Sequence, residues 1–205
     1  MSTSKSSLSE AFKARGSLHA LSDDVDVPDA VIQDIVRDAV LHSPSPFNCQ
    51  AGRAVALLRV EHKKFWDLAH EVAKATVAPP VFAKAYEPRI KMFRDAYGTI
   101  LFYESGTVLK EVGEQRPVVK DKIPQWSEHA TGMLQYAVWV MLCNEGLGVN
   151  LQHYNPMVDA AVAKEWNIPD DWSLKAQMVF GKPAGPRFIA KEFDPVENRV
   201  LFFDS

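Results

Sequence analysis

The stretch SPSPFNCQAGRAVALLRVEHKKFWDLAHEVAKAT, residues 43–76, places a stiff loop, an apolar strand and an amphipathic helix in immediate succession. The prolines of residues 43–46 lack an amide proton and push the residue before each of them toward extended geometry, so no helix continues through this loop. Residues 53–60 (RAVALLRV) predict a buried strand, and residues 61–76 predict a helix with one apolar face. A strand followed at once by a helix favours a chain that alternates between the two.

The same alternation extends to both sides of this stretch. Upstream, residues 31–41 repeat apolar side chains at helical spacing behind Pro28 and Asp29, and the predicted helix ends near His42. Downstream, residues 97–104 (YGTILFYE) are rich in β-branched and aromatic side chains and predict a second strand. The other predicted elements are a helix over residues 128–145 with Ser127 as its N-cap and Gly146 beyond its end, a helix from Asn155-Pro156 through Trp166, and strands over residues 174–181 and 198–203.

Helices inserted between strands in comparable number favour an α+β fold, built as a three-layer α/β/α sandwich. Residues 106–125 carry prolines and mixed charges, which indicates an irregular or partly helical excursion over the surface, in enzymes often a lid. Neither an internal repeat nor a linker is visible, and 205 residues suffice for one core. We therefore expect a single domain over residues 1–205.

Composition excludes several classes of partner. The formal net charge of -3 offers no general attraction to nucleic acid or anionic lipid. The longest apolar run, residues 136–143, is far shorter than the roughly 20 residues that cross a bilayer. The N-terminus lacks the apolar core of a secretory signal, and Cys49 and Cys143 show no Cys-x-x-Cys spacing, which fits a reducing compartment. We expect a cytoplasmic protein with no nucleic-acid partner and no membrane partner.

Several chemical motifs are absent from the sequence. Gly146-x-Gly148 follows a helix and lacks the third glycine of a dinucleotide-binding fingerprint. There is no Walker-type phosphate loop, no Gly-x-Ser-x-Gly nucleophile elbow and no His-Glu-x-x-His pair among the six histidines. Metal-dependent and acyl-transfer chemistry are therefore not expected, and we assign no metal ligand.

Two polar segments in the first quarter of the chain suit a phosphorylated, heterocyclic ligand. In residues 15–19 (RGSLH), a fixed cation, a hydroxyl and an imidazole at alternate positions suit a phosphate group, although a solvated helix end explains them as well. In residues 43–50 (SPSPFNCQ), a stiff backbone carries hydroxyls and amides that suit a ring with alternating carbonyls and nitrogens. An ordinary helix-to-strand connection is the alternative for this second segment.

Two further segments lie in the last third of the chain. Residues 146–155 (GLGVNLQHYN) are too polar at their end for a core strand and predict an unusual polar loop beside the apolar helix, which suggests a site. Residues 181–192 (GKPAGPRFIAKE) offer positive charge from a loop shaped by glycine and proline, and a solvated basic loop is the alternative. The cations of this loop are Lys182, Arg187 and Lys191.

Taken together, in this order and at these separations, the four segments resemble the nitroreductase family, and specifically its short branch found in fungi and some bacteria. The resemblance covers nearly the whole chain, from Arg15 to the final predicted strand. The tracts that carry it are SPSPFNCQAGRAV, EHKKFWDL, YGTILFYE, LQHYNPMVDAAVAKEW and MVFGKPAG. The resemblance implies a homodimer with FMN at the subunit interface, and a mostly antiparallel central sheet completed by the partner's C-terminal strand.

The resemblance also implies roles for individual residues. Its N-terminal Arg-x-Ser-x-basic segment grips the flavin phosphate and ribityl chain, which implicates Arg15, Ser17 and His19. Its Ser-Pro-Ser-x-x-Asn-x-Gln loop reaches the flavin from the other subunit, which implicates Pro44, Ser45, Pro46, Asn48 and Gln50. Its polar segment after the apolar helix lies along the flavin ring, which implicates Leu151, Gln152 and His153, with a backbone amide near flavin N5.

The sequence departs from the family pattern at two positions. A second arginine is common where this chain has Gly16, and a basic residue is common where it has Phe193. Lys191 matches the other member of that late basic pair, and Arg187 is the substitute we expect for the missing one. Both departures bear on how tightly the phosphate is held.

The activity that the resemblance implies is two-electron reduction of nitroaromatics, N-oxides or quinones, with NADH or NADPH as the electron donor and a role in oxidative-stress defence. Flavin N5 carries the chemistry in ping-pong turnover, so no catalytic side chain is assigned. One alternative is a flavin-binding redox regulator with little turnover. Relatives that dehalogenate aromatics or fragment flavin usually carry long lid insertions, for which this chain is short.

Overall fold

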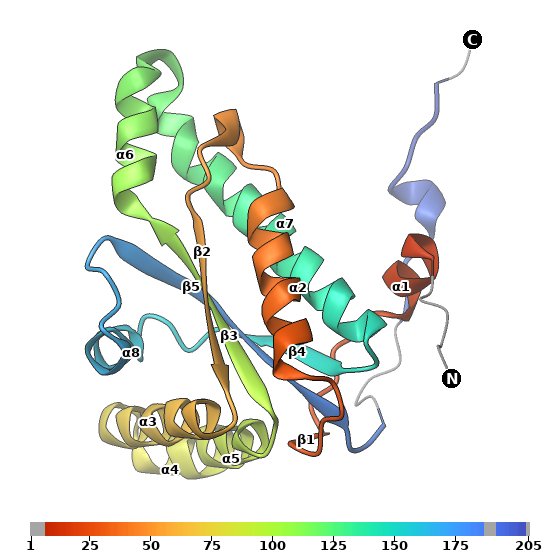
Figure 1. Ribbon diagram of the computed structural model, residues 1–205, viewed down its shortest axis with the longest axis vertical. Coiled ribbons are helices and arrows are strands. Elements are labelled where there is room, and N and C mark those ends of the chain that lie inside the picture. Colours follow the sequence, from red (N-terminus) through yellow and green to blue (C-terminus); the bar gives the residue numbers. More distant parts are fainter. Residues whose placement is uncertain (1–6, 187–191, 204–205) are drawn as a thin grey trace.

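The computed structural model describes residues 7–186 and 192–203. Residues 7–186 form a central sheet with helices on both of its faces, three layers in all (Figure 1). Helices α2 (Asp29–His42) and α7 (Ile123–Asn144) cover one face of the sheet, and helices α3 (Val60–Thr76), α5 (Glu87–Arg94) and α8 (Asp159–Trp166) cover the other. This arrangement confirms the predicted three-layer α/β/α sandwich. No helix in these ranges is both long enough and apolar enough to span a membrane.

The sheet has five strands in the described ranges, and all of their pairings are antiparallel. The strands are β1 (Leu21–Ser22), β2 (Gly52–Leu58), β3 (Gly98–Ser105), β4 (Gly148–Gln152) and β5 (Trp172–Pro183). Their order is β1-β5-β3-β2, and β4 also pairs with β5. The order ends at β2, so the outer edge of this seven-residue strand has no partner strand among the described residues.

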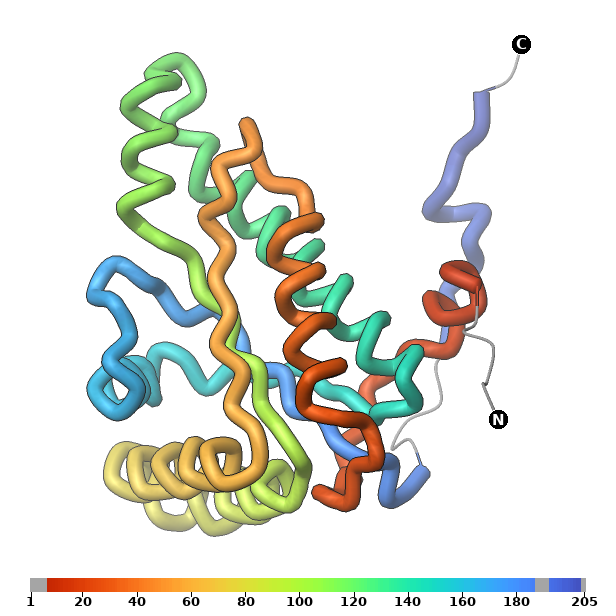
Figure 2. Tube along the Cα trace, in the orientation of Figure 1, coloured from red at the N-terminus to blue at the C-terminus, as the bar shows by residue number. Residues whose placement is uncertain are grey.

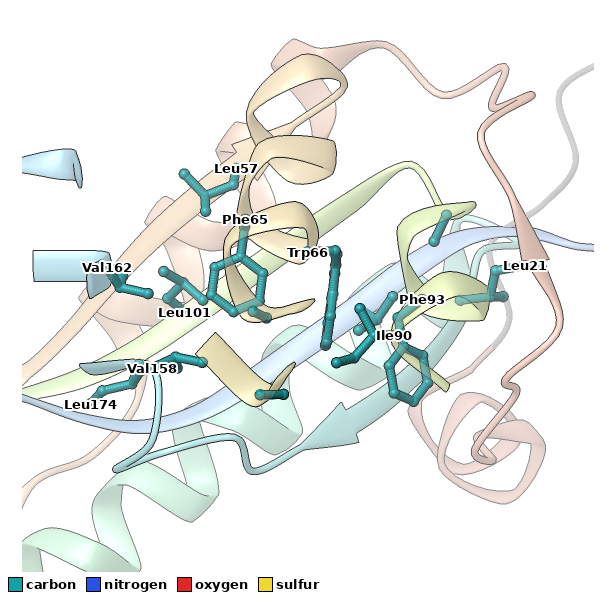
Figure 3. Packing of buried hydrophobic residues seen from close by; sticks show 14 of the residues in the cluster. Leu21, Leu57, Phe65, Trp66, Ile90, Phe93, Leu101, Val158, Val162 and Leu174 are labelled. Carbon is teal, nitrogen blue, oxygen red and sulfur yellow. The ribbon is translucent and has the colours of Figure 1, made fainter. Parts of the chain in front are cut away.

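Each face of the sheet carries its own apolar core. On the α3 side, Phe65, Trp66 and Phe93 pack against the sheet and are almost fully buried (Figure 3). On the α2 and α7 side, Ile32 and Phe102 belong to a second cluster of buried residues. Burial of this apolar area is the main driving force for folding, and two such cores explain why the sheet is covered on both faces.

Shorter elements complete the described chain. They are α1 (Leu8–Ala14), η1 (Pro46–Asn48), α4 (Pro79–Val81), the π-helical turn η2 (Phe82–Tyr86), α6 (Gly106–Gln115), η3 (Pro117–Lys122) and η4 (Val196–Asn198). Helix α6 and turn η3 lie within the excursion predicted at residues 106–125, which is therefore largely helical. Ser105 caps α6 by accepting a hydrogen bond from the Val108 amide.

The predicted end of α7 is confirmed, but its predicted start is wrong. Gly146 has φ of 82°, and the Leu147 amide donates to the Leu142 carbonyl at 3.1 Å, as in a Schellman cap. The helix begins at Ile123 rather than after Ser127, with a proline in its first turn. Ser127 is buried inside the helix, where its hydroxyl donates to Glu104 Oε1 at 2.5 Å. A tertiary hydrogen bond therefore replaces the predicted cap.

Three other expectations need correction. Residues 148–152 form strand β4 rather than a polar loop, because the Asn150 amide finds a backbone acceptor at Leu18. Helix α8 begins at Asp159 rather than at Pro156, since a turn occupies the residues before it. Residues 199–203 form no strand in this chain, and Phe203 is 94% exposed. A strand needs a neighbouring strand for its hydrogen bonds, and none of the described strands of the same chain pairs with this tail, so its predicted pairing with a partner's sheet stays a prediction.

Candidate functional site

Residues far apart in the sequence meet beside strand β4. We call residues 15–19 the N-terminal segment and residues 150–155 the β4 segment. Ser17 forms a parallel bridge with Val149, and the Leu18 amide donates to the Val149 carbonyl at 2.9 Å. The N-terminal segment therefore runs along the free side of β4.

A cleft opens where these two segments face helix α5. It consists of two hollows of about 450 and 550 Å³, which share Arg89 and Gln152. Such volumes fall within the range of roughly 300 to 1,000 Å³ that holds small molecules and cofactors. The other lining residues are His19, Ala85, Tyr86, Met92, Phe93, Leu151, His153, Tyr154, Asn155 and Met157. No described residue of the lining is a carboxylate, so the cleft favours an electron-rich or anionic guest.

Arg89 lines both hollows, although nothing in the sequence singled it out. It lies on α5 and is exposed. Its side chain is close enough to lower the pKa of His19 and to act on Tyr154. A cation on an amphipathic helix usually faces solvent, so only the packing of α5 beside β4 reveals that Arg89 belongs to the cleft.

His19 is the last residue of the N-terminal segment; it lies beside α5 and is half-buried. Its ring is 6.3 Å from the Phe93 ring, centroid to centroid. Partial burial, and secondly the Arg89 cation, lower the pKa of His19 below its ordinary value of 6.5. His19 is therefore neutral at neutral pH and offers one donor and one acceptor rather than a fixed positive charge.

Arg15 caps the end of α1 and rests on helix α7. Its guanidinium carbon is 4.6 Å from the centre of the Trp139 ring, a distance at which a cation and an aromatic face attract one another. Ser17, two residues further on, is exposed. The cation and the hydroxyl predicted for phosphate binding thus lie on one short segment that leads into the cleft at His19.

The β4 segment forms the opposite wall of the cleft. Gln152 Nε2 donates to Asn150 Oδ1 at 2.8 Å, and Asn150 Nδ2 donates to the Leu18 carbonyl at 2.8 Å. This relay joins the β4 segment to the N-terminal segment. Tyr154 packs edge-on against Trp66 with ring centroids 5.2 Å apart, and burial raises the pKa of Tyr154 to about 12. Its hydroxyl is therefore protonated at neutral pH.

The second predicted segment, residues 43–50, lies elsewhere in the same chain. We call residues 43–50 the amide loop; it connects α2 to β2 and lies apart from β4 along the trace (Figure 2). Asn48 and Gln50 are exposed, and both have left-handed backbones, with φ of 52° and 53°. The loop lines a separate hollow that shares no residue with the cleft. Of the loop residues predicted to bind FMN, Pro44, Ser45 and Gln50 line this hollow, and Pro46 and Asn48 lie in turn η1.

Two predicted cofactor ligands, Arg187 and Lys191, lie outside the described residues. Phe193, which stands where a basic residue was expected, is 77% exposed. None of the described residues of the late basic loop, residues 181–192, therefore lines the cleft.

A further feature outside the cleft is an apolar hollow on the side of α7 turned away from the sheet. We call this the α7 outer face. Met133, which lies there, is 45% exposed. The hollow is lined by Leu8, His129, Gly132, Met133, Tyr136, Ala137, Val140 and Met141. Exposed apolar patches of this kind commonly mark a contact surface.

Comparisons with known proteins identify the family. The model of the nitroreductase family matches residues 12–182. The protein HBN1 of Saccharomyces cerevisiae is 35% identical over 180 residues, which are 86% of this chain and 88% of that protein. The nitroreductase FRM2 of the same yeast is 34% identical over 143 residues, 69% of each chain. The solved nitroreductase CinD from Lactococcus lactis, in complex with chloramphenicol, has a TM-score of 0.88 at 35% identity, covering 97% of this chain and 100% of that one.

The fold and these similarities define the class of protein, a flavin-dependent oxidoreductase. Because the family model spans most of the chain and HBN1 is matched over most of its length, the chain belongs to the nitroreductase family.

Proposed function

We propose that this protein is an NAD(P)H-dependent reductase of nitroaromatics, N-oxides or quinones that holds FMN in the cleft, as a homodimer of single-domain chains. The observation that carries the proposal is the meeting of the N-terminal segment and the β4 segment in one cleft beside Arg89. These are two of the segments that the family resemblance implicates in flavin binding, and nothing in the sequence spacing forces them together.

The residues present fit a flavin. A phosphate needs cations and hydroxyls, and the N-terminal segment carries both, in Arg15 and Ser17, before it reaches the cleft at His19. A flavin ring needs donors to its carbonyl oxygens and an apolar wall, and Arg89, Gln152 and Phe93 supply these along the cleft. The carboxylate-free lining is consistent with a ring that gains negative charge on reduction. Arg89 is the cation that we assign to that charge.

When bound, FMN supplies the redox chemistry, taking a hydride from NADH or NADPH and passing an electron pair to the second substrate. The protein's own residues then have three tasks. Arg15 and Ser17 bind the phosphate, Arg89 and neutral His19 donate to the polar edge of the guest, and the aromatic wall excludes water. The half-buried Tyr154 hydroxyl keeps its proton at neutral pH, so Tyr154 does not act as a base.

A second copy of the chain completes the site in this proposal. The amide loop holds donors and acceptors suited to a flavin ring, but it lines a hollow separate from the cleft of its own chain. The α7 outer face offers apolar surface to the same partner. A two-fold dimer would bring the amide loop of each chain to the cleft of the other, and the exposed residues 200–203 would add to the partner's sheet.

The relatives support small aromatic substrates. CinD has been solved with chloramphenicol, with nicotinic acid and with 4-nitrophenol, each an aromatic compound. At 35 to 38% identity over nearly the whole chain, these complexes favour a guest of that size here.

The visible spectrum of the purified protein tests the proposal. Bound oxidised flavin should give a band near about 450 nm that bleaches on addition of NADH or NADPH. Continued NAD(P)H consumption with an added quinone should follow, which a redox regulator with little turnover would not sustain. Colourless protein that stays colourless after incubation with FMN would overturn the assignment.

A further inference from the structure

We propose that Gln177 is a positioning residue, which sets the backbone of the β4 segment so that the His153 amide faces the cleft. The inference rests on the proposed function, since the amide is offered to a flavin. Gln177 lies on β5 in the middle of the sheet, opposite Leu101 of β3 and Gln152 of β4, and it is fully buried. A buried amide is costly unless its donor and its acceptor are both satisfied.

Both ends of the Gln177 amide are satisfied by the β4 segment. Its Oε1 accepts the Tyr154 amide proton at 2.6 Å, and its Nε2 donates to Asn155 Oδ1 at 3.2 Å. One bond holds the main chain and the other holds a side chain of the next residue. Gln177 therefore holds the β4 segment at Tyr154 and Asn155, just after strand β4 ends and its backbone hydrogen bonds with β5 stop.

These two hydrogen bonds determine which backbone amide of the segment remains available to a ligand. The Tyr154 amide is used by Gln177, and Gln152 is held by its pairing with β5. Among the described residues, no hydrogen bond uses the His153 amide. In extended chain, successive amides point to opposite sides, so the His153 amide points away from Gln177. His153 lines the cleft, and its amide is the donor that the segment presents there.

A second buried amide holds the other end of the segment. Asn150 is almost fully buried and bonds to Leu18 and Gln152, as described for the cleft. The presented amide thus lies between two anchored positions. This fits a donor that must be held at a fixed place before the guest arrives, since misplacement by about 1 Å can lower a reaction rate a hundredfold.

The test replaces Gln177 in the full-length protein with methionine, which matches its length but not its hydrogen bonds. Met178→Ala is the matched control, because Met178 is equally buried on the same strand and belongs to the core on the other face. The first readout needs no flavin: hydrogen exchange at the Tyr154 amide in the FMN-free protein. The second is the rate of flavin reduction by NADH or NADPH and the reduction potential of the FMN-loaded protein.

We expect Gln177→Met to speed exchange at Tyr154 at least about tenfold, with amides of β5 still protected, and to slow flavin reduction about 10- to 100-fold. FMN affinity should change much less, because Arg15 and Ser17 remain. Gln177→Glu supplies a rescue: its protonated carboxyl has the donor and acceptor of the original amide, so its rate relative to wild type should recover as pH falls. Met178→Ala should lower thermal stability without slowing flavin reduction.

Equal rates and potentials in wild type and Gln177→Met would overturn the inference, as would a loss of rate in Met178→Ala proportional to its loss of stability. Should Gln177→Met fail to fold, Asn155→Ala removes one of the two bonds and leaves β5 intact, and a normal flavin reduction rate in that variant would also overturn it. If wild-type protein binds no FMN, the proposed function fails. Faster exchange at the Tyr154 amide in Gln177→Met would then still show that Gln177 holds the backbone of the segment.

Discussion

The β4 segment and the amide loop carry the same kinds of polar group, but they are held in opposite ways. The polar groups of the β4 segment are bonded to the rest of the chain through its own buried Asn150 and through buried Gln177 of β5. In the amide loop, Asn48 and Gln50 are exposed and lie in left-handed conformations. Such conformations are uncommon for residues with a side chain, and they persist where the surroundings fix them or a function requires them.

If the site is shared between two chains as proposed, the difference indicates which half is complete in one chain. The β4 segment already has its cleft, its anchors and its aromatic support. The amide loop has stiffness from its prolines and a bond from the Gln50 amide to Ser45 Oγ at 2.9 Å, yet Asn48 and Gln50 are exposed. A segment that is ordered but exposed is what a site shared between two copies requires.

The largest expected effect comes from separating the two subunits of the proposed dimer, and with them the cleft of one chain from the amide loop of the other. Met133→Glu places a charge on the α7 outer face, and burying an unpaired charge at an interface costs several kcal/mol. We expect a monomer that has lost essentially all of its bound flavin, measured by light scattering and by the visible spectrum. Val118→Glu, at a 97% exposed position on η3, is the control and should remain a coloured dimer. A coloured monomer would show that one chain suffices.

The next effect tests the support of the β4 segment. Trp66, which packs on Tyr154, donates to Thr99 Oγ1, and Thr99 also bonds to His62 Nδ1 at 2.8 Å. Burial lowers the pKa of His62 from 6.5 to about 4. As pH falls, His62 therefore takes up a proton in the unfolded chain before it does so in the folded chain, which favours unfolding. The free energy of unfolding should be constant above about pH 6.5 and should fall by about 3 kcal/mol in all as pH drops to about 4.

Urea unfolding at a series of pH values measures this loss. His62→Gln should flatten the curve between these two pH values, whereas His42→Gln, at an exposed position, should leave it unchanged. A wild-type curve without a decline in that window would mean that His62 titrates normally. The amide loop contains no acid, base or histidine, so its own hydrogen bonds should not respond.

A third prediction concerns the assignment of residues to different chains. Arg15→Ala should weaken FMN binding by about 1.5 to 3 kcal/mol, the usual value of a charge-assisted hydrogen bond. Asn48→Ala should weaken it as well. In a mixed dimer of the two variants, one site would carry both defects and the other site neither. Flavin occupancy should then recover to about half of the wild-type value, measured by absorbance in differently tagged, co-purified chains.

The control for this mixture is the dimer of Arg15→Ala with itself, which should bind FMN weakly at both sites. If each cleft used residues of one chain only, both sites of the mixed dimer would carry a single defect. No recovery would be seen in that case, and the shared site would be refuted.

The smallest effect concerns the internal stiffness of the amide loop. Ser45→Ala removes the acceptor of the Gln50 amide, which is typically worth about 1 kcal/mol. FMN affinity should fall about fivefold with an unchanged dimer. Ser43→Ala is the control, because no hydrogen bond of its side chain is found among the described residues. Equal affinities of the two variants, measured by fluorescence titration of FMN, would show that loop stiffness does not matter.

Local patterns predicted most of the fold. Helices α2 and α3 and strands β2, β3 and β5 follow from apolar periodicity and proline positions, since these act within a few residues. Gly146 ends α7 as predicted because a left-handed cap depends only on local backbone conformation. The start of α7 was missed because Ser127 is a good cap by type, and its bond to Glu104, 23 residues away, is not visible in the sequence.

The site was predictable only in part. The N-terminal and β4 segments were named from their residue types and do lie together. Arg89 and Gln177 were missed, because their roles arise from packing between elements distant in sequence. Strand β4 was missed because Asn150 looks too polar for a strand until Leu18 supplies its acceptor. The roles of the named residues toward a flavin stay predictions.

The unpaired outer edge of β2 has a consequence for biosynthesis. An open edge of seven residues can pair with the same edge of another unfinished molecule, which leads to aggregation. In a freshly synthesised chain, the outer edge of β2 is exposed until another chain covers it. Yield on expression should therefore depend on how soon each new chain meets a correctly folded one, and slower synthesis at lower temperature should increase the recovered amount.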